Sequence, residues 1–291
     1  IKNEKYILRS FLQETDDTKP SFSFHLRTEK KVSLAEISSE KSKIIILGNP
    51  GLGKTTELKE LALSMWKEGP QDIIPVFKNL RNFTITDQIE TSLPIDTEEF
   101  SSYFIILDGL DEIKDINNFL SKFEEFVNKI DNSNNSCKWV LSCRTNIYES
   151  YVKHVASFDV YFLEDLSHSE GLSLLENMSH MGNINLPYEY FSFLKNPFSI
   201  NVLAKYIAKY GRPPRNRKDL WENYIDERLT SDEREKFKRV KLNINQIKRN
   251  ARKISLIHEM MQSTTIHEKD MFEIIPANEL DEFKINPLIE K

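Results

Sequence analysis

Residues 48–56 read Gly-Asn-Pro-Gly-Leu-Gly-Lys-Thr-Thr, a complete phosphate-binding loop of the Gly-x-x-x-x-Gly-Lys-Thr type. An apolar run over residues 44–47 precedes this loop, and a helix-like stretch over residues 57–67 follows it. The motif requires this strand–loop–helix context. Glycine is otherwise scarce, because three of the chain's 8 glycines lie in the loop. The context therefore favours a phosphate site over the alternative, a glycine-rich turn between a strand and a helix that binds nothing.

The residues of the loop are expected to surround a polyphosphate. Glycines allow consecutive backbone N–H groups to turn inward, and the first turn of the following helix adds unpaired N–H groups and the positive end of its dipole. Lys54 should reach the β- and γ-phosphates, and the Thr55 hydroxyl should ligate Mg²⁺. The candidate nucleotide contacts of this loop are Gly48, Asn49, Pro50, Gly51, Leu52, Gly53, Lys54, Thr55 and Thr56.

A second motif joins an apolar strand to a group of acids. The strand of residues 103–107 leads directly into Asp108, which places this carboxylate at the carboxyl edge of the sheet, where α/β folds bind ligands. Asp108 could hold Mg²⁺ together with Thr55. Asp111 and Glu112 follow closely, and one of them could orient or deprotonate an attacking water. The alternative is a strand that simply ends in a solvated polar turn.

A third strand, over residues 139–142, delivers Arg144 to the same edge. A guanidinium there could read the γ-phosphate and stabilise the charge that develops during transfer. The alternative is an arginine paired with a surface acid. The residues with candidate catalytic roles are therefore Lys54, Asp111, Glu112 and Arg144.

Short apolar strands alternate with helical periods through the first half of the chain. Strands are predicted at residues 43–47, 73–78, 103–107, 139–142 and 160–163, with helices at 55–67, 84–92 and 117–131. This alternation predicts an α/β fold with a parallel sheet flanked by helices. A short helix is also expected at residues 33–40, with Ser33 as its cap and Glu36 three residues on. After residue 163 the strand signal stops, and helices are expected at 167–178, 187–194, 199–210 and 218–229.

Composition limits the remaining classes of function. The net charge of -5 gives no global sign of nucleic-acid affinity, and the basic residues between 236 and 253 favour a solvated helix face over a nucleic-acid contact. No apolar stretch approaches membrane-spanning length, and no signal peptide is visible. Cys137 and Cys143 should point to one face of a strand as buried free thiols, which suits a cytoplasmic protein. The histidines and cysteines show no metal-ligand spacing.

The sequence Asp108-Gly-Leu-Asp111-Glu112 after an apolar strand resembles the NACHT module of STAND-type signalling NTPases. The gap between Asp108 and the acid pair carries the resemblance, since most related ATPases place a glutamate directly after the first aspartate. Further similar stretches are residues 6–9, 74–81, 162–167, 196–198 and 211–221. The resemblance covers residues 6–230 and implies an antiviral signalling ATPase of the bacterial NLR-like kind.

That resemblance implies a domain plan and further site residues. The plan is an N-terminal lead-in (1–42), a P-loop NTPase core (43–165), an all-α helical domain (166–231) and a helical extension with the start of a winged-helix-like region (232–291). Pro197 would pack on adenine, Arg144 would occupy the sensor position, and Arg9 would approach the nucleotide from the lead-in. No motif matches the family's winged-helix histidine; His258 and His267 are more simply surface histidines.

The resemblance also implies a mechanism in which ATP and ADP, with Mg²⁺, select between conformations. ADP would hold a closed monomer, and ATP with a trigger would permit assembly into a homo-oligomer. Relatives of this kind serve bacterial defence against phage, with sensor and effector parts that we expect outside these residues. Because the first residue is Ile1, the chain is expected to be a segment of a longer protein. No membrane partner is expected, and nucleic acid is a disfavoured one.

Three other interpretations of the same motifs stay open. A motor or loader ATPase acting on nucleic acid predicts a basic groove and salt-sensitive binding. A small-substrate kinase needs an acceptor pocket and an arginine-rich lid, for which Arg212, Arg215 and Arg217 are thin candidates. A nucleotide-binding scaffold with negligible turnover differs from the switch in rate and not in site.

Overall fold

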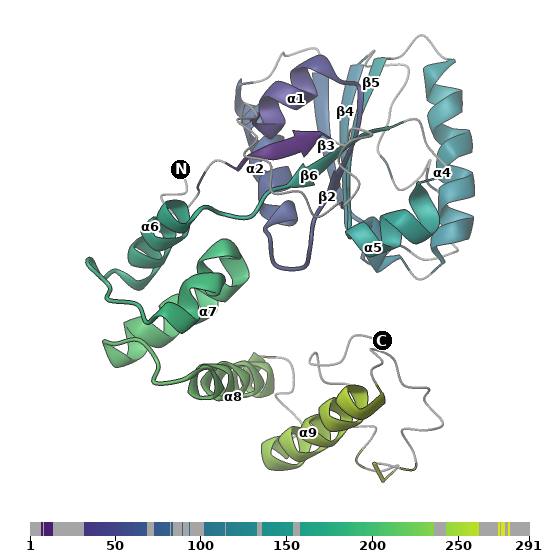
Figure 1. Ribbon diagram of the computed structural model, residues 1–291. Helices are drawn as coiled ribbons and strands as arrows, with labels where there is room; N and C mark the ends of the chain where they lie inside the picture. Colours follow the sequence, from purple (N-terminus) through teal and green to yellow (C-terminus); the bar gives the residue numbers. More distant parts are fainter. Residues whose placement is uncertain are drawn as a thin grey trace. The chain divides into compact units, whose positions relative to one another are not determined.

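A computed structural model describes most of the chain (Figure 1). The chain forms two compact units, residues 1–213 and 214–291. The described residues are 7, 9–13, 32–68, 73–81, 83, 89, 93, 102–113, 115–132, 136–153, 158–235, 243–261, 273, 275, 276 and 279.

A six-stranded sheet forms the centre of the first unit, in the order β1-β6-β2-β5-β4-β3. The five strands from β2 to β6 are parallel, and β1 is antiparallel at the edge beside β6. The α/β fold with a mostly parallel sheet is therefore confirmed. The strands are β1 (Phe11–Gln13), β2 (Lys43–Leu47), β3 (Ile73–Asn79), β4 (Ser102–Asp108), β5 (Ser136–Cys143) and β6 (Asp159–Leu163).

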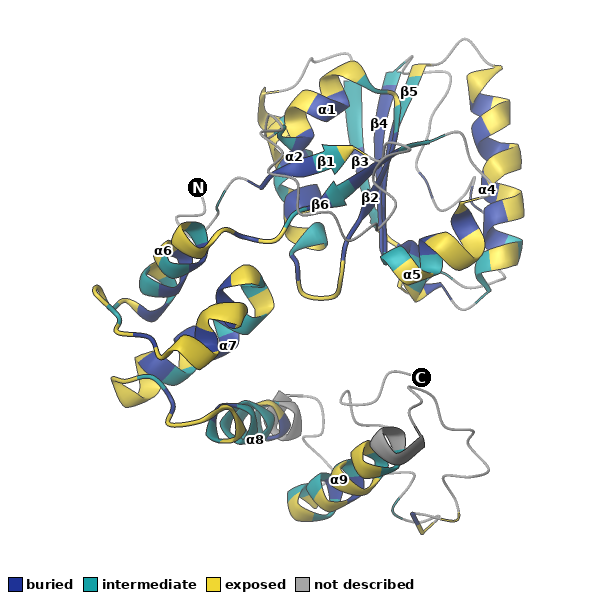
Figure 2. Ribbon diagram, viewed as in Figure 1, coloured by how far each residue is buried: buried dark blue, intermediate teal, exposed yellow. Residues whose placement is uncertain are grey.

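Alternation along the strands divides the core into two layers, because successive side chains point to opposite faces. On β2, Ile44 and Ile46 pack with helices α1 (Leu34–Glu40) and α2 (Lys54–Glu68), whereas Ile45 and Leu47 pack with α4 (Ile116–Asp131). Helices accordingly cover both faces of the sheet, and the central strands β2, β4 and β5 are buried over their carboxyl-terminal parts (Figure 2). This coverage explains why the strands read as continuous apolar runs in the sequence.

Helices α1 and α4, which lie on opposite faces of the sheet, both begin with a capping side chain. The Ser33 side chain accepts from the backbone N–H of Glu36, and the Glu36 carboxylate accepts from the backbone N–H of Ser33, so the expected capping box is present. Asp115 caps α4 through the backbone N–H of Asn118. On the buried side of α4, aromatic rings of Phe123 and Phe126 meet Trp139 edge-on.

Two features of the first unit differ from the sequence predictions, and one prediction is not tested. The lead-in contains the edge strand β1, where no strand was predicted, because a strand of three residues has no periodicity to reveal it. A short helix α5 (Thr145–Ile147) and the π-helical turn η3 (Tyr148–Val152) follow β5 and were not predicted. The predicted helix at residues 84–92 falls, except for residue 89, outside the described part of the chain.

The helices after the sheet are α6 (His168–Ser179), the 3-10 segment η4 (Tyr188–Lys195) and α7 (Pro197–Tyr210). Gly171 of α6 lies so close to η4 that an added Cβ would stand 2.1 Å from the carbonyl oxygen of Leu194. Glycine is what allows this close backbone approach. Gly211 ends α7 in the left-handed conformation, as helix C-termini commonly do.

The second unit contains two long helices, α8 (Arg217–Glu235) and α9 (Ile244–Met261). Leu229, Ile247 and Ile275 form its small buried core. Within the extension that was expected to contain the start of a winged-helix-like region, residues 262–272, which include His267, and residues 280–291 lie outside the described residues. The division of the helical part at residue 231 therefore stays a prediction, whereas the observed boundary between compact units falls at residues 213 and 214.

Both cysteines are free thiols on the α4 side of the sheet, as expected from their spacing, but only Cys143 is buried as expected, whereas Cys137 is half-buried. Burial raises the pKa of Cys143 to about 12 and that of Cys137 to about 11. In the part of the chain that the structure describes, none of the helices is both long and apolar enough to cross a membrane.

Candidate nucleotide-binding site

The loop between β2 and α2 has the backbone geometry that inward-facing N–H groups require. Gly51 and Gly53 adopt positive φ angles of 80° and 98°, where side-chain-bearing residues are strained. Lys54 opens α2, and its Nζ donates to the carbonyl oxygen of Gly48 at 2.5 Å and to that of Asn49 at 3.4 Å. Burial lowers the pKa of Lys54. The Lys54 ammonium therefore bonds to the carbonyl oxygens at the start of the loop, and a bound phosphate could replace these partners.

Thr55 and Asp108 meet at the edge of the sheet, although 53 residues separate them in sequence. The Thr55 hydroxyl donates to Asp108 Oδ2 at 2.8 Å. The Asn79 amide donates to the same oxygen at 3.2 Å. A hydroxyl and a carboxylate oxygen at this separation are hard ligands of the kind Mg²⁺ takes, with water and phosphate oxygens completing its shell. The residues therefore fit a magnesium ion.

Ser142 supports this carboxylate from the neighbouring strand β5. Its hydroxyl donates to Asp108 Oδ1 at 2.7 Å and accepts from the backbone N–H of Gly109 at 2.8 Å. The side chain has 0% exposure, so no solvent competes for these bonds. The role of Ser142 was not predicted. In the sequence, Ser142 is marked only by its even spacing from Arg144, on a strand whose end faces the loop.

The acid pair divides between two arginines. Asp111 Oδ1 accepts from the backbone N–H of Arg144 at 3.0 Å, and Asp111 Oδ2 pairs with Arg144 Nε at 2.8 Å. Glu112 is more exposed and lies 3.7 Å from Arg81 Nε. Desolvation raises the pKa of Glu112, and the negative charges of Asp111 and Asp108 add to that rise. The pairing of Arg144 with an acid was the alternative interpretation, but its partner is a site residue and not a surface acid.

The two remaining predicted contacts, Arg9 and Pro197, lie against the loop from other elements. Arg9 is buried, and its Nη1 donates to the carbonyl oxygen of Leu52 at 2.5 Å, while its Nη2 donates to that of Glu164. An added Cβ on Gly53 would stand 3.6 Å from Arg9 Nη1 and 4.0 Å from Pro197 Cγ. The Arg9 side chain therefore binds the backbone of the phosphate loop at Leu52. The expected approach of Arg9 to the nucleotide stays a prediction.

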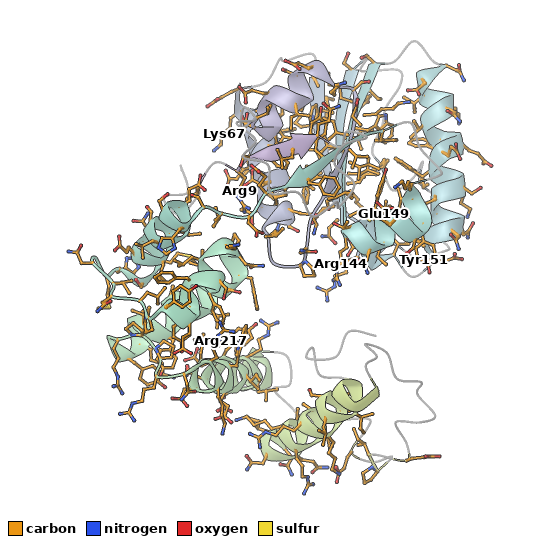
Figure 3. All side chains as sticks on the ribbon, in the orientation of Figure 1. Arg9, Lys67, Arg144, Glu149, Tyr151 and Arg217 are labelled. Carbon is orange, nitrogen blue, oxygen red and sulfur yellow. The ribbon has the colours of Figure 1, made fainter. Side chains whose placement is uncertain are left out.

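The strand order explains how these residues meet. β5 lies between β2, which leads into the loop, and β4, which ends in Asp108. Arg144 therefore leaves the sheet between the phosphate loop and the acids, and Figure 3 shows it at that edge. Among the described residues, no group of three or more His, Cys, Asp or Glu is placed to hold a metal ion.

A parallel sheet whose first central strand opens into a Gly-Lys-Thr loop, with a carboxylate bonded to that threonine, defines a P-loop NTPase fold. Within this class, the family model of "Novel STAND NTPase 3" matches residues 26–180, more than half of the chain. The chain belongs to this family, which confirms the STAND assignment made from its motifs. No curated protein matches the chain.

Solved structures with a similar fold share little sequence with the chain. The ORC1 protein of Aeropyrum pernix, solved in complex with DNA, is 13% identical over 87% of this chain and 82% of its own, with a TM-score of 0.49. The Walker-type ATPase PABY2304 of Pyrococcus abyssi is 12% identical over 85% and 87%, with a TM-score of 0.45. A RuvB mutant of Thermotoga maritima is 12% identical over 83% and 77%, with a TM-score of 0.43.

Proposed function

We propose that the chain is the nucleotide-driven engine of a STAND signalling protein, which binds ATP with Mg²⁺ and hydrolyses it slowly. The observation that carries this proposal is the 2.8 Å hydrogen bond between the Thr55 hydroxyl and Asp108. This bond joins the end of the phosphate loop to the end of β4, so that the Thr55 hydroxyl oxygen and the Asp108 carboxylate oxygen lie next to each other. Magnesium-assisted phosphoryl transfer needs this convergence.

The residues of the chain divide the work in this proposal. The loop amides and Lys54 hold the β- and γ-phosphates, and Thr55 and Asp108 would hold the metal. Magnesium, when bound, neutralises charge on the phosphate oxygens. Pro197 would pack on adenine, and the preference for ATP over GTP follows from the NACHT resemblance. Arg144 would stabilise charge at the γ-phosphate from its place beside Asp111.

Glu112 is the better candidate of the acid pair for handling the attacking water. Both oxygens of Asp111 are already engaged by Arg144, Oδ1 through a hydrogen bond and Oδ2 through an ion pair, which favours a positioning role for Asp111. Glu112 keeps its carboxylate more exposed, and the desolvation that raises its pKa also makes its anion a stronger base than an ordinary surface glutamate.

The output of the engine would be conformational. A γ-phosphate adds contacts in one arrangement of the NTPase core and the helical part and not in another, and this differential affinity shifts the population. In the proposed cycle ADP holds a closed monomer in the cytoplasm, and ATP with a trigger opens it for homo-oligomer assembly. We propose that this cycle acts in bacterial defence against phage.

The test compares ATP binding and single-turnover hydrolysis in the wild type and Glu112→Gln. The variant should bind MgATP within about twofold and hydrolyse it about 100-fold or more slowly, since general-base catalysis contributes roughly that much. Glu149→Gln, on the exposed π-helical turn, is the matched control and should change neither quantity. Normal turnover in Glu112→Gln would refute the water-handling role. Strong stimulation by DNA or RNA would favour the motor or loader alternative instead.

A further inference from the structure

The tip of the phosphate loop rests on the first turn of α7. The Asn196 side chain donates from Nδ2 to the carbonyl oxygen of Pro50 at 3.2 Å. The next contact runs from the backbone N–H of Phe198 to the carbonyl oxygen of Gly51 at 3.2 Å. Two consecutive loop carbonyls therefore bond to the same helix start, 146 residues away along the chain.

Asn196 performs two tasks at once in this contact. Its Oδ1 caps α7 by accepting from the backbone N–H groups of Phe198 at 2.9 Å and Ser199 at 3.4 Å. Its Nδ2 is thereby directed to the loop. Pro197 follows at the first helical position, where a fixed φ suits a helix start.

The fit at Gly51 is too close for any side chain. An added Cβ would stand 2.8 Å from Phe198 Cβ and 2.9 Å from Asn196 Oδ1, and the φ of 80° already favours glycine. The backbone of the loop therefore packs directly against the start of α7, with no room for a side chain between them.

The contact with α7 supplies hydrogen-bond donors that the carbonyl oxygens of a phosphate-binding loop need. The loop binds anions by turning its N–H groups inward, which requires the carbonyl oxygens to point outward and to find donors there. At Pro50 and Gly51 those donors come from α7, and at Leu52 the donor is Arg9. Without these partners the carbonyls would turn toward water and the loop would lose part of its preorganisation.

We propose that Asn196 is a positioning residue that latches the phosphate loop to α7 and holds it in its anion-binding shape. The inference rests on the proposed function for the ligand that the loop takes. The latch also couples phosphate binding to the contact between the loop and α7. If that contact favours phosphate binding, phosphate binding must strengthen the contact in return. Departure of α7 from the loop would then weaken the grip on nucleotide.

Asn196→Asp separates the latch from the cap. Aspartate caps a helix as well as asparagine does, but its carboxylate cannot donate to the Pro50 carbonyl. The variant should keep the thermal stability of the wild type within a few degrees and bind ATP about threefold to tenfold more weakly, as expected for one lost hydrogen bond. Inorganic tripolyphosphate should weaken by the same factor, because the latch acts on the phosphate grip and not on the base.

Hydrogen–deuterium exchange of the amides of residues 49–53, measured without nucleotide, provides the second readout and should be faster in Asn196→Asp. Ser167→Ala is the matched control: it removes the cap of α6 and touches no loop residue, so it should lower stability and leave affinity and loop exchange unchanged. Wild-type affinity in Asn196→Asp overturns the latch's role in phosphate binding, even if exchange rises. If the wild type binds neither ATP nor tripolyphosphate, the proposed function fails, and the exchange rates alone accept or refute the latch.

Discussion

Ser142→Ala removes the hydroxyl that holds the proposed magnesium carboxylate, and its effect can be worked from the structure. The change deletes a hydrogen bond to the Asp108 carboxylate and leaves the Gly109 N–H without its acceptor. A bond to a charged group contributes about 1.5–3 kcal/mol, and an unsatisfied buried donor costs about 1–3 kcal/mol. Because the side chain has 0% exposure, water cannot replace either bond without rearrangement. Allowing for partial relaxation, we expect a loss of about 3 kcal/mol in the free energy of unfolding.

Thermal unfolding measures that loss, which corresponds to a fall in melting temperature of roughly 6–12 °C for a unit of this size. Freed from Ser142, Asp108 can rotate away from Thr55, so the apparent Mg²⁺ affinity in the presence of ATP should fall about 10-fold to 100-fold, as for other supports of metal ligands. Ser136→Ala, at the exposed start of the same strand, is the control and should be silent. Unchanged melting temperature and Mg²⁺ affinity in Ser142→Ala would refute the reasoning.

Three further outcomes follow from other parts of the first unit. Because a general base must be deprotonated and the pKa of Glu112 is raised, hydrolysis should fall on the acid side at a higher pH than an unperturbed glutamate would give; a flat acid limb contradicts this, and Glu112→Gln should abolish the limb. Gly171→Ala should destabilise the protein by about 1–3 kcal/mol through its clash with η4, whereas Gly182→Ala, with nothing near its added Cβ, should not; equal melting temperatures would refute the packing argument. Pro197→Ala should weaken ATP modestly and spare tripolyphosphate in titrations, and an equal effect on both argues against packing on adenine.

The sheet was predictable because its signals are local and repeated. The strands from β2 to β6 are short apolar runs with both faces covered, and each expected strand lies within an observed one. The edge strand β1 and the π-helical turn after β5 were missed for one reason. Neither has a sequence period, and both depend on neighbours that only the folded chain supplies, as when Phe11 pairs with Leu163.

The candidate site divides in the same way. The phosphate loop, Asp108 and the acid pair stand in motifs whose spacing carries chemistry, so their meeting at one edge could be predicted. Ser142 and Asn196 could not be assigned roles, because a buried serine and a helix cap look ordinary in sequence. Their importance comes from what stands opposite them: Asp108 for one, and the carbonyl oxygen of Pro50 for the other. The pairing of Arg144 with an acid was an alternative in the sequence, but Asp111 could not be identified as that acid, because it was expected to handle the attacking water.

Calorimetric titration of MgATP into the wild type and Lys54→Ala tests the central claim most directly. The account predicts one binding event in the wild type that weakens when EDTA removes the metal and disappears in Lys54→Ala, while the variant keeps its fold by circular dichroism. Absence of binding heat in the wild type across temperatures, or equal affinity in Lys54→Ala, would contradict the claim that the loop and Asp108 form one magnesium–nucleotide site.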